Sequence, residues 1–303
     1  DSALLQSAAA RFLQWLFPPG SASRMPIVAV TGTNGKTTTS RMIHRMLLDS
    51  GRASGLACSD GVYIGDRLDC AGDLAGVPGH YRLLENPAID CAVMETARGG
   101  IATMGIAYDR CAVAVCLNVT PDHLETHGIE SLGQMARLKR TVLERALDGA
   151  VVNADDPLCL AMPAGLRAKN ICLVSMQRSF GELCRSHAQC SHFALLERTD
   201  GEEWVVLYDR GTRMPVIQVA RIPASCGGLA RHNVSNALHA IAAAYLVGIE
   251  VAAMRASLSR FQMNFELNPG RLNFHDSGPV RFLVDYAHNP DGIAKLSEFV
   301  DRL

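Results

Sequence analysis

The stretch Thr31–Ser40, TGTNGKTTTS, decides how the rest of the sequence is interpreted. An apolar run, IVAVT at 27–31, precedes it and predicts a buried strand, and a helical pattern runs from Lys36 to Leu48. A strand, a glycine loop and a helix in this order are the surroundings that a phosphate-binding loop requires. The first backbone N–H groups of the helix would face a phosphate, Lys36 would neutralise its charge, and the Thr37 hydroxyl would ligate Mg²⁺.

The loop is shorter than the common phosphate-loop pattern. Two residues, Thr33 and Asn34, separate Gly32 from Gly35, whereas the common pattern places four residues before its Gly-Lys pair. The alternative interpretation is a glycine turn with a solvated lysine. The order Gly-Lys-Thr at a strand–helix junction favours a nucleotide site. Because the sequence has no Asn-Lys-x-Asp motif for reading guanine, ATP is the expected nucleotide.

Short apolar runs alternate with helical patterns along most of the chain. Four Val-rich runs are unbroken, as is typical of strands buried on both faces: 91–95, 113–118, 150–153 and 171–175. Because helical patterns separate these runs, we expect parallel βαβ units in an α/β fold with a doubly wound, mostly parallel sheet. Residues 192–222 differ, and their pattern predicts an antiparallel hairpin that turns at residues 209–211.

Further elements are predicted on either side of these strands. Helices are expected at 3–17, 131–147, 233–247 and 251–261, and a strand–helix pair at 280–285 and from Pro290. The last pair is too short to form a domain alone. We therefore divide the chain into a lead helix with a linker (1–26), an ATP-binding central domain (27–270) and the start of a C-terminal domain (271–303).

Lys139 falls on the apolar side of its predicted helix. It follows Leu132 by seven residues, in the middle of a stripe that also contains Met135 and Leu143. A buried lysine is costly unless it is paired or loses its proton, although a long stem can also carry the ammonium group to the surface. The chain has 25 arginines and four lysines, so each lysine suggests a specific use. A neutral lysine can react with CO₂ to give a carbamate, which can help to hold Mg²⁺.

Polar side chains follow two of the predicted strands. Glu95 ends one Val-rich run, and the next run leads into Asn118, Asp122 and His123. Sheets of this kind bind ligands at the carboxyl ends of their strands, and we expect these two strand ends to be neighbours. Oxygen and imidazole ligands beside Thr37 would form a Mg²⁺ site. Each of these residues taken singly is more often structural.

The composition argues against several classes of protein. A net charge of −1 argues against non-specific nucleic-acid binding, and no apolar run is long enough for a membrane helix. Ten scattered cysteines, many of them in apolar runs, predict reduced thiols in a cytoplasmic protein. The segment 182–192 holds two cysteines and two histidines without the paired spacing of a zinc site, so we expect a loop there. The chain begins with Asp1, and we therefore expect a fragment of a longer protein.

Together, these motifs resemble the Mur ligase family, whose members form amide bonds with ATP. The matching stretches follow the family's order: GTNGKTTT (32–39), ETARGGI (95–101), LNVTPDHLETHG (117–128), Lys139, NADDP (153–157), GGLARHNVSNALHA (227–240), PGRLN (269–273) and DYAHNPDGI (285–293). The short phosphate loop is the usual form in this family. ETARGGI, together with LFPPG (16–20), is most similar to the arginine-adding branch that occurs in cyanophycin synthetase.

The resemblance implies a fold and a role for each matching residue. It implies a Mur ligase central domain followed by a truncated, Rossmann-like C-terminal domain. The phosphate-binding residues would be Gly32, Thr33, Asn34, Gly35, Lys36, Thr37 and Thr38. The Mg²⁺ ligands would be Thr37, Glu95, His123 and a carbamylated Lys139. Asn233 and Asn236 would face adenine, and the residues reaching the nucleotide from the C-terminal domain would be Arg271, Asp285 and His288.

The resemblance also implies a reaction in which ATP activates a carboxylate as an acyl phosphate, which an amine then attacks. The implied partners are an amino acid, expected to be arginine, a poly-aspartate acceptor bearing the carboxylate, and other domains of a larger synthetase. A homo-oligomer is compatible with the sequence. Two alternatives stay open: another ligase of this type acting on a muramyl peptide, a folate or a glutamate chain, and a nucleotide-binding scaffold that no longer ligates.

Overall fold

A computed structural model of the 303-residue chain describes all residues except 1, 17–23, 123–125 and 127. Within these residues, eleven strands form one sheet in the order β11-β10-β9-β8-β7-β6-β1-β5-β2-β3-β4. The parallel part consists of β1 (Ile27–Thr31), β2 (Ser54–Cys58), β5 (Cys91–Glu95), β6 (Cys111–Cys116), β7 (Ala146–Asn153), β8 (Asn170–Ser175) and β9 (His192–Thr199). The strand that leads into the phosphate loop therefore lies inside the sheet, between β5 and β6.

Antiparallel strands extend the sheet at both edges. They are β3 (Gly61–Ile64) and β4 (Arg67–Ala71) at one edge, and β10 (Glu202–Asp209) and β11 (Thr212–Gln218) at the other. The predicted turn at residues 209–211 is confirmed, because Asp209 pairs with Thr212 across it. Arg210 and Gly211 both have positive φ, as a two-residue hairpin turn requires. The hairpin has a third strand, β9, which pairs with β10.

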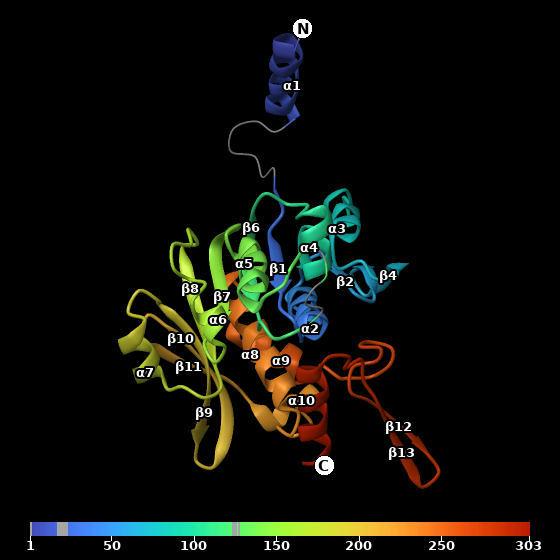
Figure 1. Ribbon diagram of the computed structural model, residues 1–303, viewed down its shortest axis with the longest axis vertical. Helices are drawn as coiled ribbons and strands as arrows, with labels where there is room; N and C mark the ends of the chain where they lie inside the picture. Colours follow the sequence, from blue (N-terminus) through green and yellow to red (C-terminus); the bar gives the residue numbers. More distant parts are fainter. Residues whose placement is uncertain (1, 17–23, 123–125, 127) are drawn as a thin grey trace.

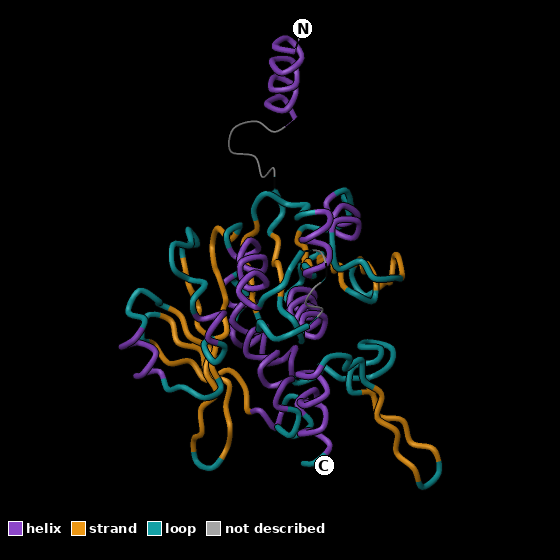
Figure 2. The backbone as a smooth tube through the Cα atoms, viewed as in Figure 1, coloured by secondary structure: helices purple, strands orange, loops and turns teal. Residues whose placement is uncertain are grey.

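Helices cover both faces of the sheet (Figure 1; Figure 2). One face packs against α2 (Lys36–Asp49), α8 (Arg231–Leu246) and α9 (Val251–Leu258). The other packs against α3 (Val77–Leu84), α4 (Arg98–Met104), α5 (Leu132–Leu143), α6 (Pro157–Leu160) and α7 (Phe180–Ser186). In β1, Val28 and Val30 belong to the first apolar core, whereas Ile27 and Ala29 belong to the second. Burial on both faces explains why the central strands are unbroken apolar runs.

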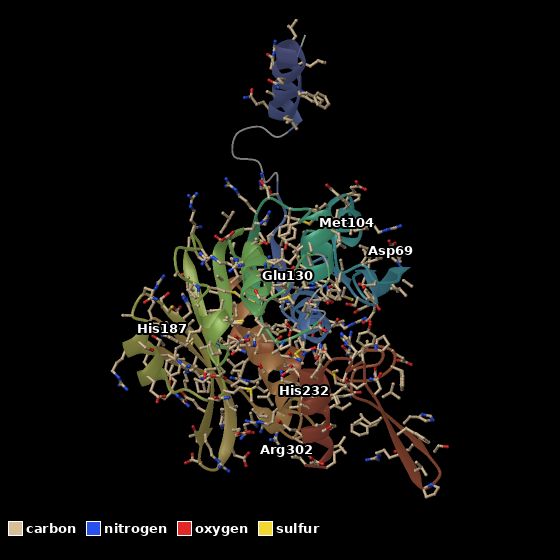
Figure 3. The ribbon with its side chains drawn as sticks, viewed as in Figure 1. Asp69, Met104, Glu130, His187, His232 and Arg302 are labelled. Atoms are coloured by element: carbon tan, nitrogen blue, oxygen red, sulfur yellow. The ribbon has the colours of Figure 1, made fainter. Side chains whose placement is uncertain are left out.

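The C-terminal residues form a small unit beside the sheet. β12 (Asn273–Ser277) and β13 (Val280–Val284) make a separate antiparallel pair, and α10 (Pro290–Val300) follows. Phe299 of α10 is buried with Ala230 and Leu272, so this helix packs on the start of α8. Figure 3 labels His232 at this junction, where its ring meets Phe299 edge-on at 6.4 Å.

The remaining elements are the N-terminal helix and two short 3₁₀ turns. α1 (Ser2–Leu16) lies apart from the sheet in Figure 1, and its large apolar side chains Leu4, Phe12 and Trp15 are exposed. Two short 3₁₀ turns, η1 (Val219–Arg221) and η2 (Pro223–Ser225), join β11 to α8. All ten cysteines lie in the described part of the chain and are free thiols. No helix among the described residues is long and apolar enough to span a membrane.

Several sequence predictions about the elements are wrong. The loop expected at 182–192 begins inside a helix, because α7 continues to Ser186. The helix predicted at 131–147 ends at Leu143, and β7 starts at Ala146, earlier than the predicted residue 150. The apolar stripe continued through this junction because a buried helix and a buried strand both use apolar residues. The strands β2, β3, β4 and β12 were not predicted, and their shared feature is a short run with Gly, Ser or charged residues.

The packing of α2 on the sheet yields a stability prediction. Leu47 is 1% exposed, and Leu47→Ala would leave a cavity between α2 and the sheet. We expect the free energy of unfolding to fall by about 2–5 kcal/mol, measured by urea denaturation. The matched control is Leu68→Ala on the edge strand β4, where the side chain is 46% exposed and the expected change is below about 1 kcal/mol. Equal losses for the two variants would contradict the assignment of α2 to the core.

Candidate active site

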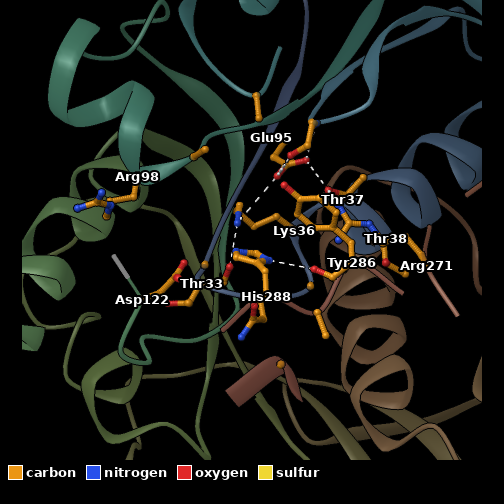
Figure 4. A pocket seen from close by; sticks show the side chains of 18 of the residues that line it. Thr33, Lys36, Thr37, Thr38, Glu95, Arg98, Asp122, Arg271, Tyr286 and His288 are labelled. Atoms are coloured by element: carbon orange, nitrogen blue, oxygen red, sulfur yellow. Dashed lines mark hydrogen bonds and ion pairs between the residues drawn. The ribbon is translucent and has the colours of Figure 1, made fainter. Parts of the chain in front are cut away.

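A cavity of about 440 Å³ opens where β1 and β5 end, between the sheet and the C-terminal unit (Figure 4). The phosphate loop forms its floor. Many of the residues singled out in the sequence line it: Gly32, Thr33, Asn34, Gly35, Lys36, Thr37, Thr38, Glu95, Asp122, Lys139, Asn233, Asn236, Arg271, Asp285 and His288. The fold thus gathers residues from distant parts of the chain around one space.

Two glycines let the phosphate loop turn between β1 and α2. Gly32 has φ +155° and Gly35 has φ +87°, a region that side chains with a Cβ rarely adopt. A Cβ on Gly32 would lie 2.9 Å from Leu117 Cβ, and one on Gly35 would lie 2.3 Å from Asn236 Oδ1. The short spacing seen in the sequence is therefore accommodated by close backbone packing.

The first turn of α2 is available for an anion. The residue before the helix is Gly35, and within the described residues no side chain caps the helix. The first N–H groups of a helix have no partner inside it, so they are free to bind a phosphate. In the loop before the helix, the Asn34 N–H donates to Asn118 Oδ1 at 2.9 Å. The expected role of Asn34 as a phosphate-binding residue stays a prediction.

Glu95 is buried at the end of β5 and is held by the loops around it. Thr37 Oγ1 donates to Glu95 Oε2 at 2.9 Å, and Lys36 Nζ lies 4.0 Å from Oε1 (Figure 4). Ser59 donates from its N–H group and its hydroxyl, at 3.2 and 3.1 Å. Sequence analysis missed Ser59, because a single serine after a short strand carries no pattern. Hydroxyl and carboxylate oxygens in this arrangement could ligate a hard cation such as Mg²⁺.

Lys139 is buried on α5, which decides between the two alternatives that the sequence left open, a buried amine and an ammonium group at the surface. Its side chain is 1% exposed, and no hydrogen bond or ion pair holds it within the part of the chain that the structure describes. Burial lowers the pKa of Lys139 to about 7, and the nearby charge of Lys36 lowers it further in the same direction. The thiols of Cys116 and Cys159 lie near this amine. An unpaired, partly neutral amine beside the phosphate loop is a suitable nucleophile for CO₂.

The residues after β6, which the sequence analysis expected to help form a Mg²⁺ site, are placed differently from that expectation. β5 and β6 are not neighbours, since β1 lies between them, so the expectation of adjacent strand ends is wrong. Asn118 turns inward and its amide bonds the backbone of Thr33 and Asn34, which removes it from the expected Mg²⁺ ligands. Asp122 lines the cavity, and His123 lies outside the described residues. Among those residues, no group of three or more His, Cys, Asp or Glu side chains could hold a metal.

The two asparagines of α8 are buried next to the phosphate loop. Asn236 Nδ2 donates to Asn233 Oδ1 at 3.0 Å, and Asn233 Nδ2 donates to the Ala224 carbonyl at 2.9 Å. Both line the cavity. Their predicted contact with adenine stays a prediction.

The C-terminal unit closes the other side of the cavity. Arg271 donates to Thr37 Oγ1 at 3.3 Å, its guanidinium stacks on the Tyr286 ring at 4.7 Å, and its Nε is buried with no hydrogen-bond partner in the described residues. An unsatisfied guanidinium donor beside the loop fits an anionic ligand. The Asp285 carboxylate accepts hydrogen bonds from the N–H groups of Leu272 and Ala287, so it fixes the backbone of this unit. His288, like Asp285, lines the cavity (Figure 4).

Comparison with known proteins supports the resemblance to the Mur ligase family. The sequence profile of the Mur ligase middle domain matches residues 30–244. A cyanophycin synthetase from Crocosphaera subtropica is 38% identical over 98% of this chain, and the match covers 34% of that protein. A UDP-N-acetylmuramyl-tripeptide synthetase from Deinococcus radiodurans is 31% identical over 89% of the chain and 52% of the relative. The chain thus spans about a third of the length of the cyanophycin synthetases that it matches.

Solved structures share the fold at lower identity. A UDP-N-acetylmuramoyl-L-alanyl-D-glutamate–2,6-diaminopimelate ligase superposes with a TM-score of 0.66 at 22% identity, over 96% of this chain and 56% of the other. A bifunctional folylpolyglutamate synthase/dihydrofolate synthase, solved with Mn, AMPPNP and L-glutamate bound, gives 0.64 at 19% identity, over 98% and 69%. The sequence profile, the fold and the resemblance of the motifs agree. This chain belongs to the Mur ligase middle-domain family.

Proposed function

We propose that this chain is the ATP-binding part of an amide-bond ligase that adds arginine to the aspartate side chains of a poly-aspartate backbone. The observation that carries this proposal is the convergence of Lys36, Thr37, Glu95 and the buried Lys139 on one cavity at the end of the sheet. The similarity to cyanophycin synthetases supports the arginine and poly-aspartate assignment.

The nucleotide and the metal would be held by residues of both units. Lys36, Thr37 and the first N–H groups of α2 would bind the phosphates, and Asn233 and Asn236 would face adenine. Arg271, Asp285 and His288 would approach the nucleotide from the C-terminal unit. The metal ligands would be Thr37, Glu95, His123 and the carbamate of Lys139. A bound Mg²⁺ would supply neutralisation of the charge on the terminal phosphates.

The proposed reaction has two steps. An acceptor carboxylate oxygen attacks the γ-phosphorus of ATP, and the bond from this phosphorus to the oxygen that bridges it to the β-phosphate breaks. The products of this step are an acyl phosphate and free ADP. The neutral arginine amine then attacks the carbonyl carbon, phosphate departs, and the amine nitrogen gives up one proton. Lys36 and Arg271 would stabilise the charge on the transferred group.

The test uses the full-length natural protein with ATP, arginine and an aspartate-bearing peptide. We expect ADP and phosphate in equal amounts with the new amide bond, and no AMP, measured by chromatography and mass spectrometry. AMP as the product would rule out an acyl phosphate. Ligation of glutamate in place of arginine, or use of a muramyl peptide in place of the aspartate-bearing peptide, would refute the substrate assignment and retain the ligase.

Lys36→Met is expected to reduce kcat/KM for ATP by about 100-fold or more, since it removes the loop lysine that we propose neutralises the transferred phosphoryl group. Steady-state kinetics measure this loss. Lys169→Met is the matched control: Lys169 is an exposed lysine that pairs with Asp148, and its loss should leave kinetics unchanged. A Lys36→Met enzyme with normal kinetics would refute the phosphate-loop assignment.

Carbamylation of Lys139 is tested with ¹³C-labelled bicarbonate and NMR. At pH 8 the amine is mostly neutral, because its pKa is lowered to about 7, and we expect a carbamate resonance. Below pH 7 the amine gains a proton and cannot attack CO₂, so the resonance should form slowly or not at all. It should be missing from Lys139→Met and present in Lys169→Met. A resonance that survives Lys139→Met would show that another amine is modified.

A further inference from the structure

Asn34, at the tip of the phosphate loop, is held from two sides. Its backbone bonds the amide of Asn118, which accepts from the Asn34 N–H at 2.9 Å and donates to its carbonyl at 3.1 Å. Its side chain reaches in the other direction, to the start of α10. The loop is thus tied both to the sheet and to the C-terminal unit.

The contact with α10 is a reciprocal amide pair. Asn34 Nδ2 donates to Asn289 Oδ1 at 3.1 Å, and Asn289 Nδ2 donates to Asn34 Oδ1 at 3.0 Å. Asn34 Nδ2 also donates to Asp291 Oδ2 at 2.8 Å, and the same oxygen accepts from Lys295 Nζ at 2.7 Å. Asn289 is 4% exposed, so water competes little for these bonds.

Asn289 and Asp291 contact the phosphate loop through the Asn34 side chain. Asn34 lines the cavity, whereas neither Asn289 nor Asp291 is among the described residues that do so. Arg271 differs from them, because it lines the cavity itself and also bonds Thr37. Asn289 Oδ1 also caps α10 by accepting from the Gly292 N–H at 2.8 Å, so the amide pair is built into the first turn of that helix.

We propose that Asn289 and Asp291 are positioning residues that fix the phosphate loop through the Asn34 side chain. The inference rests on the proposed function, and it assigns a role that the sequence motifs do not. The loop contains two glycines with positive φ. When α10 is not docked on the loop, their backbone freedom raises the entropic cost of adopting the one conformation that binds a triphosphate. Docking of α10 restricts that freedom, so closure of the C-terminal unit and triphosphate binding strengthen each other.

The test compares ATP with adenosine in the full chain, using calorimetric binding measurements. Asn289→Ser keeps an oxygen that can cap α10 but removes the amide that reaches Asn34. We expect ATP to bind about tenfold more weakly to this variant, with adenosine binding unchanged, because only the phosphates use the loop. Glu298→Ala, an exposed change on the same helix, is the matched control and should bind ATP normally.

A double-mutant cycle with Asn34→Ala then separates positioning from helix capping. If Asn289 acts through Asn34, the double variant binds ATP no more weakly than Asn34→Ala alone. Additive losses, normal ATP binding by Asn289→Ser, or equal weakening of ATP and adenosine would each overturn the inference while leaving the proposed function intact. Failure of the unmodified chain to bind ATP would overturn both.

Discussion

The structure depends on the tight turn that joins β1 to α2. Gly32 and Gly35 adopt backbone angles that other residues avoid, and the space where their side chains would lie is already filled by Leu117 and Asn236. The amide of Asn118 then fixes the backbone between them. This packing aims the first turn of α2, with its unsatisfied N–H groups, into the cavity. The rest of the site is arranged around that turn.

The sheet brings the chemical groups to the turn from different directions. β5 delivers Glu95 to the Thr37 hydroxyl, and α5, packed on the opposite face from α2, delivers Lys139. A buried amine without a partner is costly in its charged form, and its lowered pKa is the consequence. Burial of this amine lowers the stability of the fold. Residues with perturbed pKa values cluster at functional sites.

The local parts of the fold and of the site were predictable from the sequence. The Val-rich runs identified the central strands because burial on both faces leaves little choice of side chain. The seven-residue spacing from Leu132 placed Lys139 on the apolar side of its helix, but it left open whether the amine is buried. Strand order was not predictable, since pairing of β1 with both β5 and β6 depends on packing across the whole sheet. The edge strands β3 and β4 are partly exposed and therefore lack a clear apolar pattern.

Contacts between distant segments also could not be predicted from the sequence. Asn118 follows a strand and looked like a metal ligand, yet its amide is consumed by the phosphate loop. Hydrogen bonds join Ser59 to Glu95 and Asn289 to Asn34, and no local sequence pattern relates the residues of either pair. In each case the side chain could make several kinds of bond, and only its position in the fold decides which one forms.

The central claim is that a triphosphate and a divalent cation lie between the α2 turn and Glu95. The most direct measurement is a crystal structure with Mn²⁺ and a non-hydrolysable ATP analogue, with the metal located by anomalous scattering. The account predicts a manganese peak within bonding distance of Thr37 Oγ1 and of a Glu95 oxygen, with the phosphates over the first turn of α2. A nucleotide bound elsewhere, or a metal away from both side chains, would contradict it.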